Sequence, residues 1–88
     1  MKLHGEFVVR QVMDVTVAIP VGQTALQLNG MILLNDVSQV IWTCLEQETD
    51  LDRITAAVTD AFEVSSEEAQ TDILEFLEKL RKMQLLEE

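Results

Sequence analysis

The segment Asn29–Trp42, NGMILLNDVSQVIW, places a turn signal, an apolar strand and a helix start directly after one another. Asn-Gly is a favoured two-residue turn, because both residues tolerate the positive φ of a type I′ turn. Met31–Leu34 carries no polar side chain, so we expect both faces of this strand to be covered by protein or ligand. Asn35 is suited to cap the helix that follows. The segment therefore predicts a strand that leads straight into a helix, and function depends on whether its free edge is used.

The length of 88 residues allows one domain with a single modest core, and we expect one domain over residues 1–88. The apolar runs are far shorter than the roughly 20 residues that a membrane span needs, so a membrane is not an expected partner. No export signal is recognisable at the start of the sequence. The single cysteine, Cys44, excludes a disulfide framework. The expected location is therefore the reducing cytoplasm.

The charge is strongly negative and unevenly distributed. The net charge is −10, and the stretch from Glu46 to Glu75 holds ten acids but a single base, Arg53. Nucleic acid is a poor partner for such a surface, since its binding depends on Lys and Arg that neutralise phosphates. The acids form either a solvated, solubilising face or a surface that steers a basic partner. The second alternative predicts an association rate that falls with salt.

The hydrophobic pattern changes from a period of two to a period of about 3.6 near residue 36. The predicted strands are 7–13, 15–21 and 31–34, with 25–28 as a candidate for a short extra strand. The predicted helices are 36–47, 51–62 and 66–83, and Trp42 lies at the margin of the first apolar stripe. Thr49 or Asp50 is expected to cap the second helix, and Ser65 with Glu68 forms a capping box for the third. Leu85-Leu86 is expected to fold back or to form a short extended segment. This order predicts an α+β domain, in which an N-terminal three-stranded antiparallel sheet precedes a three-helix bundle, as in winged-helix folds.

Groups suited to catalysis are scarce in this chain. The only histidine, His4, lies in a terminal segment that we expect to be mobile. Cys44 sits on an apolar helix stripe, where a buried, inert thiol is expected. The sequence contains no Gly-rich phosphate loop, metal-ligand spacing or nucleophile elbow. We therefore expect no enzyme, no cofactor and no metal site.

One apolar residue of helix 66–83 falls outside its core stripe. Leu74 lies about 100° from Ile73 on a helical wheel, so it is either a scattered surface residue or the wall of a shallow groove. If residues 31–34 form a sheet edge, an extended peptide could pair with their main chain and rest on this flank of the helix. The candidate peptide-binding residues are then Met31, Ile32, Leu33, Leu34, Gln70, Leu74, Leu77 and Arg81. Asp72, Phe76 and Lys79 form the alternative wall. The site would be lost if the strand were central or its edge covered by residues 23–28.

Several short motifs follow one another along the chain. They are Leu28-Asn29-Gly30-Met31-Ile32, Leu34-Asn35, Ile41-Trp42, Thr49, Asp72-Ile73, Phe76-Leu77, Leu80 and Leu85-Leu86. With these motifs the chain resembles the PqqD-like family of recognition elements for ribosomally synthesised and post-translationally modified peptides (RiPPs), from about Phe7 to Glu88. The distinctive matches are Asn-Gly, Leu-Asn, Ile-Trp and Asp72, since the others are apolar core positions.

The resemblance implies a small winged-helix-like domain without catalytic activity. Such domains bind the leader of a precursor peptide as a strand added beside the third strand and against the third helix. They then present the peptide to a modifying enzyme, often a radical SAM enzyme. The corresponding elements here are Met31–Leu34 and Ser66–Met83. Where the family usually has small residues after Leu-Asn, this chain has Asp36-Val37-Ser38-Gln39, and the bulkier Gln39 is expected to affect which peptide is bound.

Two alternatives come from other functional classes. A winged-helix regulator that binds DNA or a regulatory partner is disfavoured by five acids on helix 66–83, against three bases clustered near its end. A homodimeric scaffold could instead pair edge strands between two copies of the chain.

Overall fold

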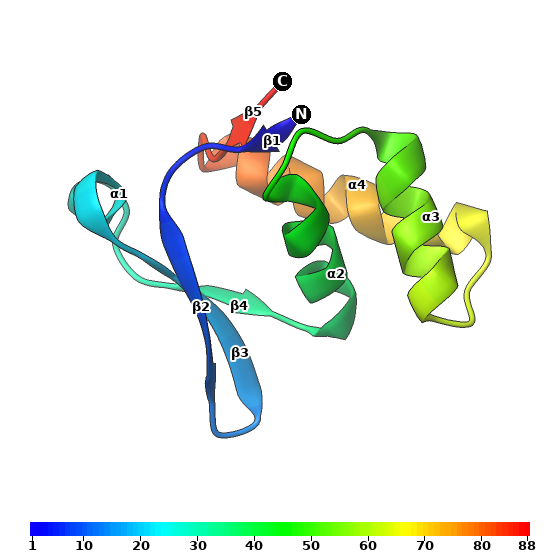
Figure 1. The fold of residues 1–88 in the computed structure, drawn as a ribbon, viewed down its shortest axis with the longest axis horizontal. Coiled ribbons are helices and arrows are strands. Elements are labelled where there is room, and N and C mark those ends of the chain that lie inside the picture. The colour runs from blue at the N-terminus through cyan, green and yellow to red at the C-terminus, as the bar shows by residue number, and fades with distance from the viewer. The chain divides into compact units, whose positions relative to one another are not determined.

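A computed structural model describes residues 1–88 and divides them into two compact units, which are drawn together in Figure 1. One unit is Gly5–Asp36, and the other combines Met1–His4 with Val37–Glu88. Each unit is described by itself below. The single domain expected from the chain length stays a prediction. None of the helices combines the length and the apolar character that a membrane crossing requires.

The unit Gly5–Asp36 is built on a three-stranded antiparallel sheet with the order β2-β3-β4. Its elements are β2 (Phe7–Val12), β3 (Val15–Pro20), α1 (Gly22–Gln27) and β4 (Ile32–Leu34). Val12 pairs with Val15, so Met13 and Asp14 form a two-residue loop. Strand 7–13 was predicted one residue too long, because Met13 turns the chain with a φ of 58°.

The region between β3 and β4 differs from the prediction. Residues 25–28 were a candidate strand, but Gly22–Gln27 forms helix α1. The buried Thr24 on this helix accepts a hydrogen bond from the backbone N–H of Glu6, at 2.8 Å. Since a helix precedes Asn29-Gly30, no hairpin forms there. Of Asn29 and Gly30, only Gly30 has a positive φ, of 91°. The predicted type I′ turn, which needs a positive φ at both residues, is therefore wrong.

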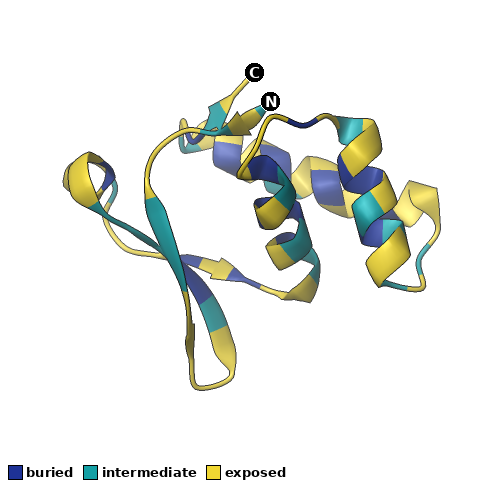
Figure 2. Ribbon diagram, viewed as in Figure 1, coloured by how far each residue is buried: buried dark blue, intermediate teal, exposed yellow.

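The two faces of β4 differ in burial. Ile32 and Leu34 are buried, as is Ala18, the partner of Ile32 on β3. Met31 and Leu33 are 56% and 63% exposed, respectively. Figure 2 shows the alternation of buried and exposed residues along β4. Protein therefore covers one face of β4 only, and the expected cover of the other face by a ligand stays a prediction. The strand has the alternating burial of an antiparallel sheet with one solvated face, although all its side chains are apolar.

The second unit contains α2 (Asp36–Leu45), which starts at the boundary between the units, α3 (Leu51–Ala61) and α4 (Ser66–Lys82). Each helix ends one or two residues before its predicted end. Asp50 caps α3 by accepting a hydrogen bond from the N–H of Arg53 at 2.8 Å, and Ser65 caps α4 by accepting one from Glu68 at 3.1 Å. Trp42, placed at the margin of its stripe by the sequence, is 2% exposed. The buried apolar residues of this unit are Ile41, Trp42, Leu45, Ile54, Val58, Ala69, Ile73, Leu77, Leu80 and Leu85.

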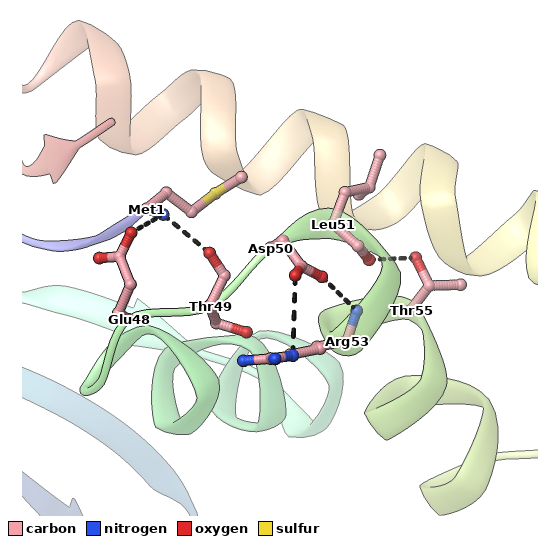
Figure 3. Close-up of polar contacts among 7 residues, drawn as sticks. All are labelled: Met1, Glu48, Thr49, Asp50, Leu51, Arg53 and Thr55. Atoms are coloured by element: carbon pink, nitrogen blue, oxygen red, sulfur yellow. Dashed lines mark hydrogen bonds and ion pairs between the residues drawn. The ribbon is translucent and has the colours of Figure 1, made fainter.

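The two ends of the chain pair with each other in this unit. β1 (Lys2–Leu3) and β5 (Leu86–Glu87) form a two-stranded antiparallel sheet, and the N–H of His4 donates to the carbonyl oxygen of Leu85 at 2.8 Å. The amino group of Met1 contacts Glu48 at 2.8 Å and the carbonyl oxygen of Thr49 at 2.7 Å (Figure 3). The terminal segment that was expected to be mobile is therefore held by backbone pairing.

The fold is thus α+β, with a three-stranded antiparallel sheet and four helices rather than three. The extra helix is α1. The winged-helix-like arrangement of sheet and bundle stays a prediction.

Candidate functional site

Strand β4 lies at the edge of its sheet. It pairs with β3 on one side and has no strand neighbour on the other. In an antiparallel pair, successive residues direct their N–H and C=O groups alternately toward the partner and away from it. The outer side of β4 therefore carries main-chain donors and acceptors that a further strand could use.

The face of β4 that carries Leu33 continues across the sheet. Leu33 lies opposite Val17 on β3, and Val17 lies opposite Arg10 on β2, so the three side chains form a row on one face. Val17 is buried in the central strand, whereas Leu33 and Arg10 are exposed. A strand added beside β4 would extend this row, with its own side chains next to Met31 and Leu33.

Helix α4 carries the other predicted binding residues, in the second unit. Leu74 is 53% exposed and Gln70 is half-buried, one turn before it. Leu77 is only 2% exposed, so its side chain belongs to the core of this unit. On the alternative flank, Asp72 and Lys79 are exposed and Phe76 is half-buried. Leu74 is therefore the large apolar residue that α4 exposes to solvent.

Arg81 is engaged by two carboxylates. Its guanidinium donates to Glu78 at 2.8 Å and to both carboxylate oxygens of Glu88, at 2.7 and 3.0 Å. The hydrogen bond from Arg81 is the main reason why the pKa of Glu88 lies below its ordinary value. The same bonds raise the pKa of Arg81. A bound peptide could use Arg81 only by replacing one of these carboxylates or by joining them.

Several other polar groups of the helical unit stabilise local structure. Asp50 contacts the Arg53 side chain at 3.7 Å in addition to its capping bond, and Thr55 donates to the carbonyl oxygen of Leu51 at 2.7 Å (Figure 3). Cys44 is half-buried, and burial raises the pKa of its thiol, so the sulfur is protonated at neutral pH. The His4 ring lies 3.4 Å from Glu87 on the exposed terminal sheet.

Sequence reasoning missed one surface of the sheet unit. Val12, Met13 and Val15 form an exposed apolar tip on the β2–β3 hairpin. A signal was present, since the loop between two β-branched strands contains Met where Gly or Asn is usual.

A comparison with protein families settles the relationship of the chain. The model of the family described as coenzyme PQQ synthesis protein D (PqqD) matches residues 17–86. The chain belongs to the PqqD family. The matched residues include β4 and α4, the two elements that carry the predicted site. The PqqD family implies an accessory peptide-binding chaperone of coenzyme PQQ biosynthesis. No curated protein and no solved structure gives a significant match.

Proposed function

We propose that this protein binds the leader of a ribosomally synthesised precursor peptide and presents it to a modifying enzyme of the radical SAM class. The leader binds as a fourth strand along the outer edge of β4. Membership of the PqqD family supports a peptide chaperone, and the observation that carries the mode of binding is the one-sided pairing of β4. The cytoplasmic location expected from the single cysteine stays a prediction.

The main chain supplies the first part of the proposed recognition. A peptide beside Met31–Leu34 pairs with the outward N–H and C=O groups by β-strand addition, which is tolerant of the peptide sequence. The short length of β4, three residues, limits the number of these bonds. Main-chain pairing therefore has to be supplemented by side-chain contacts.

Side chains supply the second part. Met31 and Leu33 are exposed beside the edge, and a peptide strand that covers them removes apolar surface from water. On α4, the proposed contacts are the exposed Leu74 and the polar side chain of Gln70, with Leu77 supporting them from the core. Arg81 is proposed to donate hydrogen bonds to an acidic group of the peptide in place of those to Glu88.

A titration of the ¹⁵N-labelled protein with leader peptides tests both surfaces. The proposal predicts amide shifts concentrated on residues 31–34 and on α4. Shifts confined to other elements would contradict the assigned site. Leu74→Ser reports on α4 separately, with Lys79→Ser on the alternative flank as its matched control, since both positions are exposed. Weaker binding for Leu74→Ser alone supports the assigned flank, and weaker binding for Lys79→Ser alone assigns the opposite one.

The open edge of β4 also permits the edge-paired homodimer. In that case the protein alone would sediment as a dimer that resists dilution, and leader peptides would dissociate it. A monomer at all concentrations would exclude this alternative. The DNA-binding alternative predicts retention of a duplex at low salt, which we do not expect for a chain of net charge −10.

A further inference from the structure

The corner between α2 and α3 holds an open cavity of about 530 Å³, within the range of roughly 300–1,000 Å³ that is usual for small-molecule sites. Its lining residues come from the last turn of α2, the loop that follows and the first turn of α3, all within the helical unit. They include Cys44, Glu46, Glu48, Thr49 and Arg53. None of these residues belongs to the proposed leader site.

Arg53 brings a cation with free hydrogen-bond donors to this cavity. Its Nε atom lies 3.7 Å from Asp50, and its two terminal nitrogens form no hydrogen bond or ion pair. Asp50 uses its other carboxylate oxygen to cap α3. Free guanidinium nitrogens are unexpected in a chain with 16 acids and six bases. The planar guanidinium matches a carboxylate, which it can bind through two parallel hydrogen bonds.

Thr49 supplies a second hydrogen-bond donor. It is 9% exposed, and its hydroxyl makes no hydrogen bond, because Asp50 is the residue that caps α3. No side-chain oxygen or nitrogen is fully buried without a partner, so this hydroxyl must reach the open cavity. Figure 3 shows it on the side of the loop that faces Arg53. A ligand oxygen that accepts a hydrogen bond from the hydroxyl would satisfy a polar group that burial shields from water.

Negative charge is present at the same cavity. Glu46 is exposed and forms no ion pair, whereas Glu48 is held by the amino group of Met1. Helix α2 ends here, and its last turn carries no basic residue to complement the negative end of the helix dipole. A simple anion would be repelled by Glu46 and by this helix end. The cavity is therefore complementary to a ligand that carries both charges.

We propose that this cavity binds the head group of an α-amino acid with an uncharged side chain. The ligand carboxylate accepts hydrogen bonds from the Arg53 guanidinium and the Thr49 hydroxyl. The ligand ammonium group lies toward Glu46 and the C-terminal end of α2. The ligand side chain faces the uncharged lining residues, which are Thr43, Cys44 and Gln47. Since the charged groups of the cavity are exposed to solvent, we expect weak binding, with a dissociation constant of roughly 1–10 mM.

Titration of the ¹⁵N-labelled protein with L-leucine, L-leucinamide and N-acetyl-L-leucine tests the two charges separately. The amide lacks the carboxylate, and the acetylated compound lacks the ammonium group. L-leucine should shift the amides of residues 43–53, and each analogue should bind about tenfold more weakly. The proposal would be overturned if these amides showed no saturable shift up to about 50 mM L-leucine, or if all three compounds bound equally.

A fourth ligand, L-theanine, distinguishes two sources of the head group. It carries the same ammonium and carboxylate on a longer uncharged chain. Tighter binding than that of L-leucine would support a larger metabolite that ends in this head group. Weaker binding would support a free amino acid.

Variants assign the individual contacts. Arg53→Gln should weaken the binding of L-leucine about tenfold, and Thr49→Val about threefold. Lys82→Gln is the matched control and should leave binding unchanged, because Lys82 is an exposed base of the same unit that does not line the cavity. Glu46→Gln should weaken the binding of L-leucine but not that of N-acetyl-L-leucine, which has no ammonium group.

Amide spectra without ligand confirm that each variant is folded. Equal affinities of Arg53→Gln and the unaltered protein for L-leucine would contradict the proposed site. The same applies if Glu46→Gln weakened L-leucine and N-acetyl-L-leucine alike, since the loss would then not depend on the ammonium group. Neither result would affect the proposed leader binding, which uses β4 and α4.

Discussion

Met13 holds a backbone conformation that favours glycine, because its Cβ lies too close to the following carbonyl oxygen. Met13→Gly relieves this strain, and part of the gain is offset by the greater freedom of glycine in the unfolded chain. We expect the free energy of unfolding to rise by about 0.5–1 kcal/mol. Urea denaturation at a protein concentration low enough to exclude association measures it. A loss of stability would show that the Met13 side chain contributes to the fold of the monomer.

The pairing of Arg81 with Glu88 makes a prediction about pH. The pKa of Glu88 lies below its ordinary value, so the contact is fully present above the ordinary pKa of a glutamate and is lost as the pH falls through the lowered value. Carboxyl ¹³C shifts should therefore place the titration of Glu88 at lower pH than that of an unpaired glutamate. Arg81→Ala should return the midpoint to the ordinary range. An unchanged midpoint in this variant would mean that the pair is absent in solution.

At the scale of elements, the three long helices were predictable from the sequence and several short elements were not. The period of 3.6 residues and the caps at Asp50 and Ser65 are local signals, and the structure follows them to within two residues. The terminal strands β1 and β5 hold two residues each and depend on pairing across the whole chain, which no local pattern encodes. Helix α1 carried a weak signal, because Gln23, Ala25, Leu26 and Gln27 are good helix formers.

The candidate site was predictable only in part. An apolar strand at 31–34 could be identified from composition, and Leu74 from its angle on the helical wheel. Two facts about β4 required coordinates. Its place at the sheet edge depends on strand order, and which of its faces protein covers depends on packing that leaves Met31 and Leu33 exposed. The polar contacts of Arg81 depend on Glu88, whose approach follows from the path of the chain after α4.

Strand β4 gives a prediction for peptide binding. Leu33→Ser removes an exposed apolar side chain beside the open edge, so we expect leader peptides to bind about fivefold more weakly, or by about 1 kcal/mol. Leu26→Ser on α1 is the matched control, because Leu26 is also a highly exposed leucine of the same unit. Isothermal titration calorimetry compares the two. Equal affinities for both variants would exclude Leu33 from the site.

At the scale of the whole molecule, charge is the dominant feature. Thirteen of the 16 acids lie outside Gly5–Asp36, in the unit that contains α2, α3 and α4. If this surface steers a basic leader, the association rate should fall steeply with ionic strength, whereas the dissociation rate should change little. Stopped-flow measurements between low and physiological salt separate the two rates. An association rate independent of salt would assign the acids to solubility alone.

The most direct test is amide hydrogen exchange of residues 31–34 with and without a leader peptide. The amides that do not bond to β3 face the open edge and should exchange rapidly in the free protein. If the leader forms a strand along β4, these amides become protected by at least about tenfold, alternating along the strand as main-chain pairing requires. A leader that binds tightly and leaves their exchange unchanged would contradict strand addition as the mode of recognition.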